Sequence, residues 1–299
     1  MMRSILLSVS MLGIIALGSY AAQETENNAP QATRRGMRGS RGAGMGAGAG
    51  MRRGPARQGT QYVENEDGRW LVHDTERPAP PIITPGTAST QEKAGIAPSD
   101  AVVLFDGKDL SNWVSTNGSP ANWIVQDGYF TPGNRGGDIK TKESFGSCQL
   151  HLEFSSPVPA VGTSQGRGNS GVFIMSTYEV QILDSYENET YPDGQCGALY
   201  GRNVPLVNAS RKPGEWQTYD IIFHRPTFEG NEVTRKATFT VIHNGVLIQD
   251  HVVLSGGTGW IDEHTITNYE PHADKLPLQI QYHNNPVLFR NIWIRELKD

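Results

Sequence analysis

From about residue 100 to its end, this 299-residue chain consists of short runs of alternating apolar and polar side chains, separated by dipeptides that form tight turns. Asn244-Gly245 follows the run 237–243 and Asp127-Gly128 follows the run 123–125, and both dipeptides are typical of β-hairpins. No run of about a dozen residues has a helical period. The pattern predicts an all-β domain, a two-sheet antiparallel sandwich or jelly roll. The predicted strands are 102–105, 123–125, 129–131, 149–154, 172–175, 178–183, 218–223, 237–243, 246–249, 278–283 and 287–296.

Residues 1–22 have the pattern of a secretory signal peptide. Arg3 provides the positive start, residues 5–17 are apolar, and Ala21 and Ala22 are small residues that suit cleavage. The apolar stretch is short for a membrane span, which needs about 20 residues, so a membrane anchor is the less favoured alternative. We therefore expect export to a periplasm or to the extracellular space, with no membrane span left after cleavage.

The residues between the signal and the domain fall into two parts. Residues 23–60 hold seven Arg and two Glu in a Gly-rich context with little to bury, which predicts a disordered linker. This linker lacks the interleaved aromatics of RNA-binding Arg/Gly segments and follows an export signal, so we expect a tether and no nucleic-acid binding. Residues 61–98 are predicted to form an extended arm that packs on the domain, because the proline-rich stretch 77–81 is stiff and non-helical. The domain itself is predicted to span 99–299.

The two cysteines, Cys148 and Cys196, leave two interpretations open. An oxidising compartment permits a disulfide between them, but the sequence does not show that their Cα atoms come within bonding range. Two buried thiols are the equally acceptable alternative.

The stretch 178–184, Tyr-Glu-Val-Gln-Ile-Leu-Asp, is the main candidate for chemistry. Glu179 and Gln181 are two residues apart, so on a strand they face the same way, with Val180 behind them. A β-bulge near residues 182–183 would bring Asp184 to the same face. Two carboxylates on one face are what a glycosidase needs around a sugar bond. Just upstream, the Gly-rich turn 166–171 is able to approach a ligand closely.

Two further predicted strands carry polar stripes opposite apolar ones. A sheet face left in water is the simpler alternative, but solvated faces favour Lys, Glu and Thr. Stripes rich in Gln and His fit a polar ligand groove better, and we predict such a groove over the three strands. The residues of the two stripes are Gln149, His151 and Glu153, and Gln279, Gln281 and His283.

Residues 99–298 resemble the bacterial 3-keto-disaccharide hydrolase family, also described as a 3-keto-glucoside lyase/hydratase domain. The matching stretches cover the domain in order, and it is the set, rather than any one of them, that is specific. They are Leu104-Phe105-Asp106-Gly107 with Leu110 and Trp113, Asn169-Ser170-Gly171-Val172, the stretch 178–184, Gly197-Ala198-Leu199-Tyr200, Pro213-Gly214-Glu215-Trp216-Gln217, His243-Asn244-Gly245-Val246 and Phe289-Arg290-Asn291-Ile292-Trp293.

The resemblance implies a concanavalin A-like sandwich, similar to that of the family 16 glycoside hydrolases. In those enzymes one strand carries Glu, Asp and Glu, whose places here would be Glu179, Gln181 and Asp184. Gln181 cannot supply the middle charge, and Asp184 is one methylene shorter than Glu in a chemistry that needs carboxyls about 5–5.5 Å apart. We therefore do not expect this chain to use the retaining double-displacement mechanism of the family 16 enzymes.

The resemblance implies instead cleavage of 3-keto-glycosides, by removal of the C2 proton, elimination of the C1 substituent and addition of water. This route needs a base, an oxyanion binder and an acid. Glu179 or Asp184 is the predicted base, with the other as acid or hydroxyl binder, and His283 is the alternative acid or base. The predicted substrate-binding residues are Arg167, Asn169, Gln181, Tyr200, Gln281 and His151.

Other expectations concern cofactors, partners and structural residues. A divalent cation would stabilise an enediolate, although no ligand spacing here is diagnostic; the candidate ligands are Glu179, Asp184, His151, Glu153 and His283. An upstream sugar 3-oxidase is the expected functional partner, because something must make the keto substrate. Arg290 is predicted to form a structural ion pair, and the tryptophans 113, 123, 216 and 293 to be core. A non-catalytic carbohydrate-binding module and a retaining glycosidase acting on unoxidised glycans remain the alternative functions.

Overall fold

The computed structural model describes residues 61–65, 68–133, 136–260, 262 and 264–299, so the predicted signal peptide and linker lie outside the described residues. The chain divides after Pro78 into two units. In the first unit, β1 (Tyr62–Asn65) pairs antiparallel with β2 (Gly68–Leu71). Within the described residues, no helix has the length and apolar character needed to cross a membrane.

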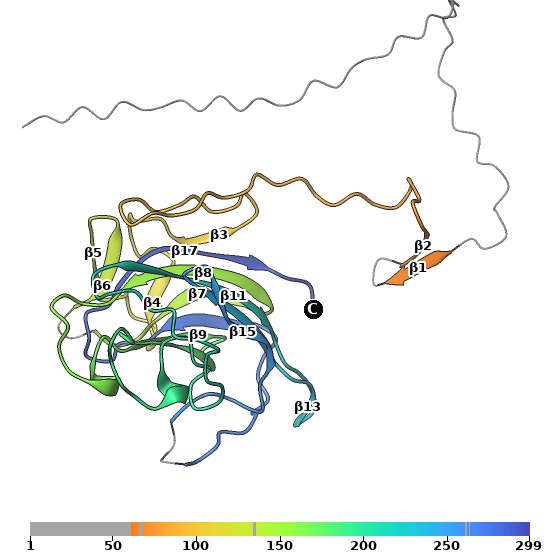
Figure 1. The fold of residues 1–299 in the computed structure, drawn as a ribbon. Helices are drawn as coiled ribbons and strands as arrows, with labels where there is room; N and C mark the ends of the chain where they lie inside the picture. The colour runs from red at the N-terminus through yellow and green to blue at the C-terminus, as the bar shows by residue number, and fades with distance from the viewer. Residues whose placement is uncertain (1–60, 66–67, 134–135, 261, 263) are drawn as a thin grey trace, which may run out of the picture. The chain divides into compact units, whose positions relative to one another are not determined.

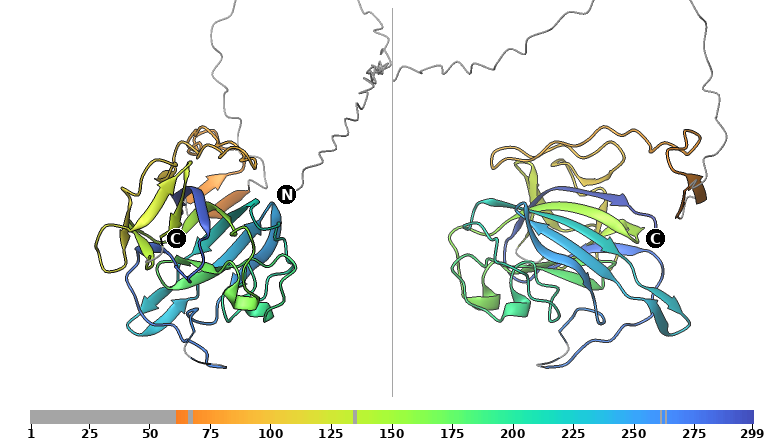
Figure 2. Two further views of the ribbon diagram at one scale, coloured as in Figure 1. Left: turned by 90° about the vertical axis from the view of Figure 1, so that its left-hand side faces the viewer. Right: turned by 45° about the vertical axis from the view of Figure 1, so that its right-hand side comes forward.

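The second unit, Ala79–Asp299, is the predicted antiparallel sandwich of two sheets (Figures 1 and 2). The smaller sheet contains five strands, and every neighbouring pair in it is antiparallel. In sheet order they are β10 (Tyr178–Ile182), β9 (Ser170–Ile174), β16 (Leu276–Ile280), β7 (Ile139–Phe145) and β4 (Trp113–Ser115).

The larger sheet contains eight strands, and both predicted hairpin turns are in it. Asp127-Gly128 and Asn244-Gly245 each have positive φ at both residues, as type I′ turns require. In sheet order the strands are β15 (Val246–Val253), β14 (Thr238–His243), β11 (Trp216–His224), β8 (Cys148–Ser155), β17 (Leu288–Glu296), β6 (Tyr129–Pro132) and β5 (Trp123–Gln126), with β3 (Val102–Phe105) beside β17. A separate ribbon pairs β12 (Thr227–Glu229) with β13 (Glu232–Arg235).

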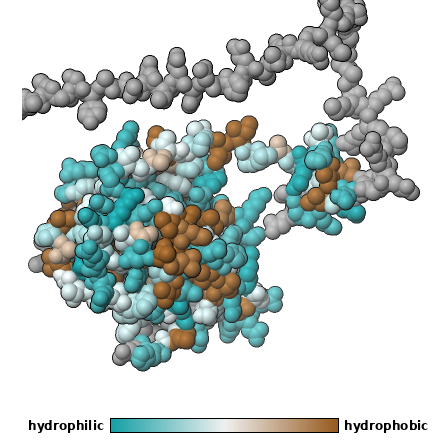
Figure 3. All heavy atoms as spheres, viewed as in Figure 1, coloured by the Kyte–Doolittle hydropathy of each residue, from teal (hydrophilic) through white to brown (hydrophobic). Residues whose placement is uncertain are grey.

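The core lies between the two sheets, and alternation along the strands builds it. In β11, the residues 217, 219, 221 and 223 are buried and their neighbours are more exposed. Of the four tryptophans predicted to be core, Trp113 and Trp123 are in the core, Trp293 is buried on the outer face of the larger sheet, and Trp216 is only partly buried. Both cysteines are buried free thiols, so Cys148 and Cys196 do not form a disulfide in this structure. Outside the core, apolar side chains also gather in a patch on the face seen in Figure 3.

β7 is the longest of the described strands that the sequence pattern did not predict; the shorter strands β1, β2, β4, β12 and β13 were not predicted either. Its sequence, Ile-Lys-Thr-Lys-Glu-Ser-Phe, has only two apolar residues, and its buried inward positions include Thr141. Thr141 is satisfied there because its hydroxyl donates to the carbonyl of Glu143 at 2.6 Å and accepts from the amide of Leu278 at 3.0 Å. A strand whose inner face is partly polar has too weak an alternation to be identified from sequence.

The polar stripe of β8 does not belong to a ligand groove, which corrects the prediction for that strand. Leu150, Leu152 and Phe154 point into the core, so His151 and Glu153 face outward from the larger sheet. Residues 89–91 cover them there: the Ser89 hydroxyl donates to Glu153.

The clasp, our name for residues 89–91 together with their partners on the larger sheet, is closed mainly by one arginine. Arg290 pairs with Glu153 at 2.7 Å (Nε to Oε2) and donates to the carbonyl of Thr90 at 2.6 Å. Gln91 adds two hydrogen bonds to the backbone of Trp216. The predicted structural role of Arg290 is therefore confirmed, and this part of the predicted arm packs on the domain.

Candidate active site

A cavity of about 490 Å³ lies on the face of the smaller sheet that is turned away from the core. Tyr178, Val180 and Ile182 of β10 are in the core, so Glu179 and Gln181 point into this cavity. We call it the sheet cavity. Its described lining residues are Gln165, Asn169, Phe173, Glu179, Gln181, Tyr191, Tyr200, Gly259, Trp260, Gln281 and His283.

Strand register brings the predicted site residues together in rows. Gln181 lies opposite Gly171 of β9, and the backbone amide of Gln281 donates to the carbonyl of Gly171 at 2.9 Å. Glu179 lies opposite Phe173 in the next row. β16 ends at Ile280, three residues earlier than predicted, so Gln281 and His283 lie just beyond the strand.

Gly171 provides the space in which the Glu179 carboxyl group sits. A Cβ added to Gly171 would overlap Oε1 of Glu179 and would lie 2.9 Å from Cε2 of Phe173. The absence of a side chain between these two residues therefore sets where the carboxyl group rests.

We expect Gly171→Ala to lower kcat at least tenfold, because the added methyl group displaces the Glu179 carboxyl group from its place. Steady-state kinetics on the folded variant measures this effect. Gly137→Ala, where an added Cβ meets nothing within 4 Å, is the matched control and should keep wild-type kcat. Equal rates for the two variants would contradict this account of Gly171.

Glu179 is a buried carboxyl group whose side-chain hydrogen-bond donor is the uncharged amide of Gln181. The residue is 4% exposed, and burial, with a smaller contribution from the charge of Asp138, raises its pKa to about 8. With the Gln181 amide oriented so that its nitrogen donates, that nitrogen lies 3.2 Å from Oε1 of Glu179 and 2.8 Å from the carbonyl of Ser170. Among the described residues lining the sheet cavity, Glu179 is the only carboxylate.

The backbone at Glu179 is held by the loop that follows β15. The hydroxyl of Thr258 accepts from the Glu179 amide at 2.6 Å and donates to the carbonyl of Thr177 at 3.0 Å. The next residues of this loop, Gly259 and Trp260, form part of the cavity wall. One loop thus both fixes the strand and covers the carboxyl group.

Amide side chains form a second wall of the sheet cavity. The short 3-10 helix Ser164–Gly166 places Gln165 where its side-chain amide lies 2.9 Å from that of Gln181. Asn169 donates to the backbone carbonyl of Gln165 at 2.7 Å. Glutamine and asparagine amides supply both donors and acceptors, which suits a ligand with several hydroxyl or carbonyl oxygens.

Aromatic side chains form the third wall. The hydroxyls of Tyr191 and Tyr200 are 2.6 Å apart, and Trp260 is 65% exposed beside them. Burial is the main reason that the pKa of both tyrosines is raised, so both keep their protons at neutral pH. A cavity with one carboxyl group, several amides and an exposed indole has the composition of a carbohydrate site.

The comparisons with known proteins show the family to which the chain belongs. The 3-keto-alpha-glucoside-1,2-lyase-like domain matches residues 100–295. The chain belongs to this family. A proposed glycosyl hydrolase from Parabacteroides distasonis ATCC 8503 is 45% identical, with a match that covers 79% of this chain and 100% of that one at a TM-score of 0.71.

Two other solved structures are more distant from this lyase-like domain. A second proposed glycosyl hydrolase from Parabacteroides distasonis ATCC 8503 is 24% identical over 66% of this chain and 99% of that one, with a TM-score of 0.47. The alginate lyase Aly36B is 9% identical over 67% and 98%, with a TM-score of 0.39. No curated protein matches the sequence. Family membership and the composition of the cavity indicate a carbohydrate-active enzyme of the glycosidase type.

Asp184 does not share the sheet cavity of the lyase-like domain with Glu179. It is 1% exposed and pairs with Arg167 at 2.6 Å (Oδ2 to Nε), and both residues line a neighbouring cavity of about 580 Å³. Arg167 also donates to the carbonyl of Tyr186 at 2.5 Å. Since the strand ends at Ile182, the chain turns away before Asp184, and the pair ties the turn 184–187 to the turn before β9.

The two predicted histidines, His283 and His151, lie in different parts of the domain. His283 is exposed and borders both the sheet cavity and the cavity of Asp184. His151 lies on the outer face of the other sheet, where it bonds to Asp220 at 2.7 Å and stacks on Trp293. The five candidate metal ligands are therefore dispersed, and in the described part of the chain no set of three or more acidic, His or Cys side chains is placed to hold a metal ion.

Five lining residues were not predicted from the sequence: Gln165, Phe173, Tyr191, Gly259 and Trp260. Trp260 carried a usable signal, because it follows a Gly-Gly-Thr-Gly run and a tryptophan in such a run has no strand in which to be buried. Gln165, Phe173 and Tyr191 come from turns and a short strand, and their local sequences contain no pattern that indicates a site.

Proposed function

We propose that this domain cleaves 3-keto-glycosides, by abstraction of the C2 proton, elimination of the C1 substituent and addition of water. The observation that carries the proposal is the buried carboxyl group of Glu179, whose pKa is raised to about 8, among amide side chains and with no second carboxylate among the described lining residues. A base with a pKa near the working pH is the most effective at removing a proton from carbon.

In the proposed first step, the Glu179 carboxylate takes the C2 proton, which the neighbouring C3 ketone acidifies. The electron pair of the C2–H bond moves into the sugar as an enediolate, and the side-chain amide of Gln281, which lines the cavity, is the proposed donor to its oxygen. The amides of Gln165, Asn169 and Gln181 already donate within the protein and shape the cavity wall. The enediolate then expels the C1 oxygen, and the C1–C2 double bond forms next to the restored ketone. Water adds to C1, the proton that it releases replaces the one taken up by the departing C1 oxygen, and Glu179 returns its proton to C2.

This assignment revises the roles of two predicted residues. Asp184 holds the turn through Arg167 and takes no proton in the proposed step. His283, at the exposed rim, is the group placed to bind a sugar hydroxyl or the incoming water. A retaining mechanism would require a second carboxylate about 5–5.5 Å from the first, and no other described lining residue supplies one.

The pH dependence tests the role of Glu179 as a base. The carboxylate form is the active one, so kcat/KM should rise tenfold per pH unit below pH 8 and level off above about pH 8. If Glu179 acted as an acid, kcat/KM would instead fall above about pH 8. The rate profile between pH 5.5 and 9.5 measures this, and a flat or falling profile would contradict the assignment.

The experiment that tests the function compares a 3-keto-glucoside with the same glucoside before oxidation, using the purified mature protein. Turnover of the keto form alone supports the proposal. Turnover of the unoxidised form would make the domain an ordinary glycosidase, and sugar binding without turnover of either would make it a binding module. We further propose that the protein is exported, on the basis of residues 1–22, and that a sugar 3-oxidase supplies its substrate.

A further inference from the structure

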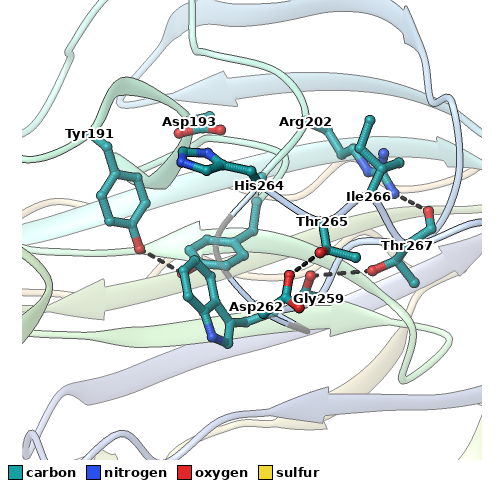
Figure 4. A pocket seen from close by; sticks show the side chains of 12 residues that line it. Tyr191, Asp193, Arg202, Gly259, Asp262, His264, Thr265, Ile266 and Thr267 are labelled. Atoms are coloured by element: carbon teal, nitrogen blue, oxygen red, sulfur yellow. Dashed lines mark hydrogen bonds between the residues drawn. The ribbon is translucent and has the colours of Figure 1, made fainter.

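A second cavity, of about 340 Å³, adjoins the sheet cavity (Figure 4). The two cavities share Tyr191, Tyr200, Gly259 and Trp260 as a common wall. We call the second one the side cavity. Its other described lining residues are Asp193, Gly201, Arg202, Asp262, His264, Thr265, Ile266 and Thr267.

The side cavity has the chemistry of a sugar site and is not explained by the reaction at Glu179. The carboxyl groups of Asp193 and Asp262 accept hydrogen bonds from hydroxyls, and the exposed indole of Trp260 provides an apolar face. Arg202 supports the loop that forms the far wall, by donating to the carbonyls of Gly257, at 2.8 Å, and Thr267. A substrate with its keto ring over Glu179 can therefore extend its C1 substituent into a second polar and aromatic site.

The two tyrosine hydroxyls lie at the boundary that such a substrate would cross. They are 2.6 Å apart, and the charge of Glu179 acts on both of them. The backbone amide of Tyr200 donates to the carbonyl of Glu179 at 3.3 Å, which anchors that ring next to the base. Tyr191 is the more accessible of the two, at 40% exposure.

We propose that the side cavity receives the leaving sugar and that Tyr191 is the acid that protonates its oxygen, with Tyr200 as a positioning residue. This inference rests on the proposed function. The C1–O bond breaks, its electron pair takes the proton from the Tyr191 hydroxyl, and the sugar departs as a neutral alcohol. The Tyr200 hydroxyl donates to the resulting tyrosinate, and the water that adds to C1 returns a proton to Tyr191.

The test varies the leaving group. A 3-keto-disaccharide has a poor leaving group that needs an acid, whereas a 4-nitrophenyl 3-keto-glucoside has one that does not. We expect Tyr191→Phe to lower kcat/KM at least 10²-fold on the disaccharide and less than fivefold on the nitrophenyl substrate. Tyr200→Phe should show the same selectivity with a loss of about tenfold on the disaccharide.

A second measurement separates the acid step from the fold and from the base. Exchange of the C2 proton with solvent deuterium depends on Glu179 alone, so Tyr191→Phe should continue to exchange the disaccharide while cleaving it slowly. Tyr129→Phe, which loses the bond to Gln126 on the other sheet, is the matched control and should match wild type on both substrates.

Two results would overturn the inference in distinguishable ways. Equal losses of Tyr191→Phe on both substrates, with wild type active on both, would reject the acid role and leave the proposed function intact. A wild-type protein inactive on both keto substrates and without C2 exchange would reject the proposed function and this inference with it.

Discussion

Glu179→Gln should lower turnover of a 3-keto-glycoside by at least 10³-fold while leaving sugar binding within about threefold of wild type. The amide keeps the size and most hydrogen-bonding capacity of the carboxyl group but cannot accept the C2 proton. Steady-state kinetics and calorimetric titration with the unoxidised glycoside measure the two quantities. Loss of C2 exchange in the same variant would place the defect in proton abstraction.

The matched control is Glu143→Gln, on an exposed position of β7, which should keep wild-type turnover. If Glu179→Gln retained more than a tenth of wild-type kcat, Glu179 would not be the base. In that case His283, which borders the same cavity, would be the next residue to substitute.

The same substitution has a consequence for stability. The folded pKa of Glu179, about 8, lies above its ordinary value near 4.5, so between these values the folded state holds the proton more often than the unfolded state. Stability of the wild type should therefore fall as the pH rises from about 4.5 to 8. Glu179→Gln removes this contribution, and urea denaturation at pH 5 and pH 8 should show a smaller decline for the variant.

The second large effect is expected in the clasp, where Arg290→Ala should lower the free energy of unfolding by about 3–5 kcal/mol. Glu153 is fully buried and Arg290 is 7% exposed, so the substitution leaves a buried carboxylate without its guanidinium partner. Burial alone would raise the pKa of Glu153, but hydrogen bonds from His151, Ser89, Asn291 and Arg290 outweigh it and hold that pKa near 2. Urea denaturation at pH 7 measures the loss.

A surface ion pair provides the comparison for the clasp. Asp100→Asn breaks the more exposed pair with Arg295 and should leave the urea unfolding midpoint close to that of the wild type. Because the clasp lies on the larger sheet, the folded fraction of Arg290→Ala should keep wild-type kcat. A loss below 1 kcal/mol for Arg290→Ala would contradict the importance of the buried pair.

Much of the fold was predictable because β-strands alternate apolar and polar residues and because tight turns use characteristic dipeptides. The two hairpins at Asp127-Gly128 and Asn244-Gly245 were predicted from two residues each, since few sequences accept positive φ twice in succession. β7 was not predicted, because its inward Thr141 is a polar residue that is satisfied by the carbonyl of Glu143 and by the amide of Leu278 on the neighbouring strand. The sequence indicated an ion pair for Arg290 but not its partners in the clasp, because Arg290 and residues 89–91 are about 200 residues apart in the chain.

The sequence by itself determined the all-β class, the hairpins and the shared face of Glu179 and Gln181, since a period of two is a property of neighbouring residues. Only the tertiary structure decided which polar face holds the site. It placed the stripe of β8 under the clasp, paired Asp184 with Arg167, and brought Tyr191 and Trp260 to Glu179. It also set the pKa of Glu179, because that value depends on burial by segments distant in the chain, and no local pattern encodes how deeply a side chain is covered.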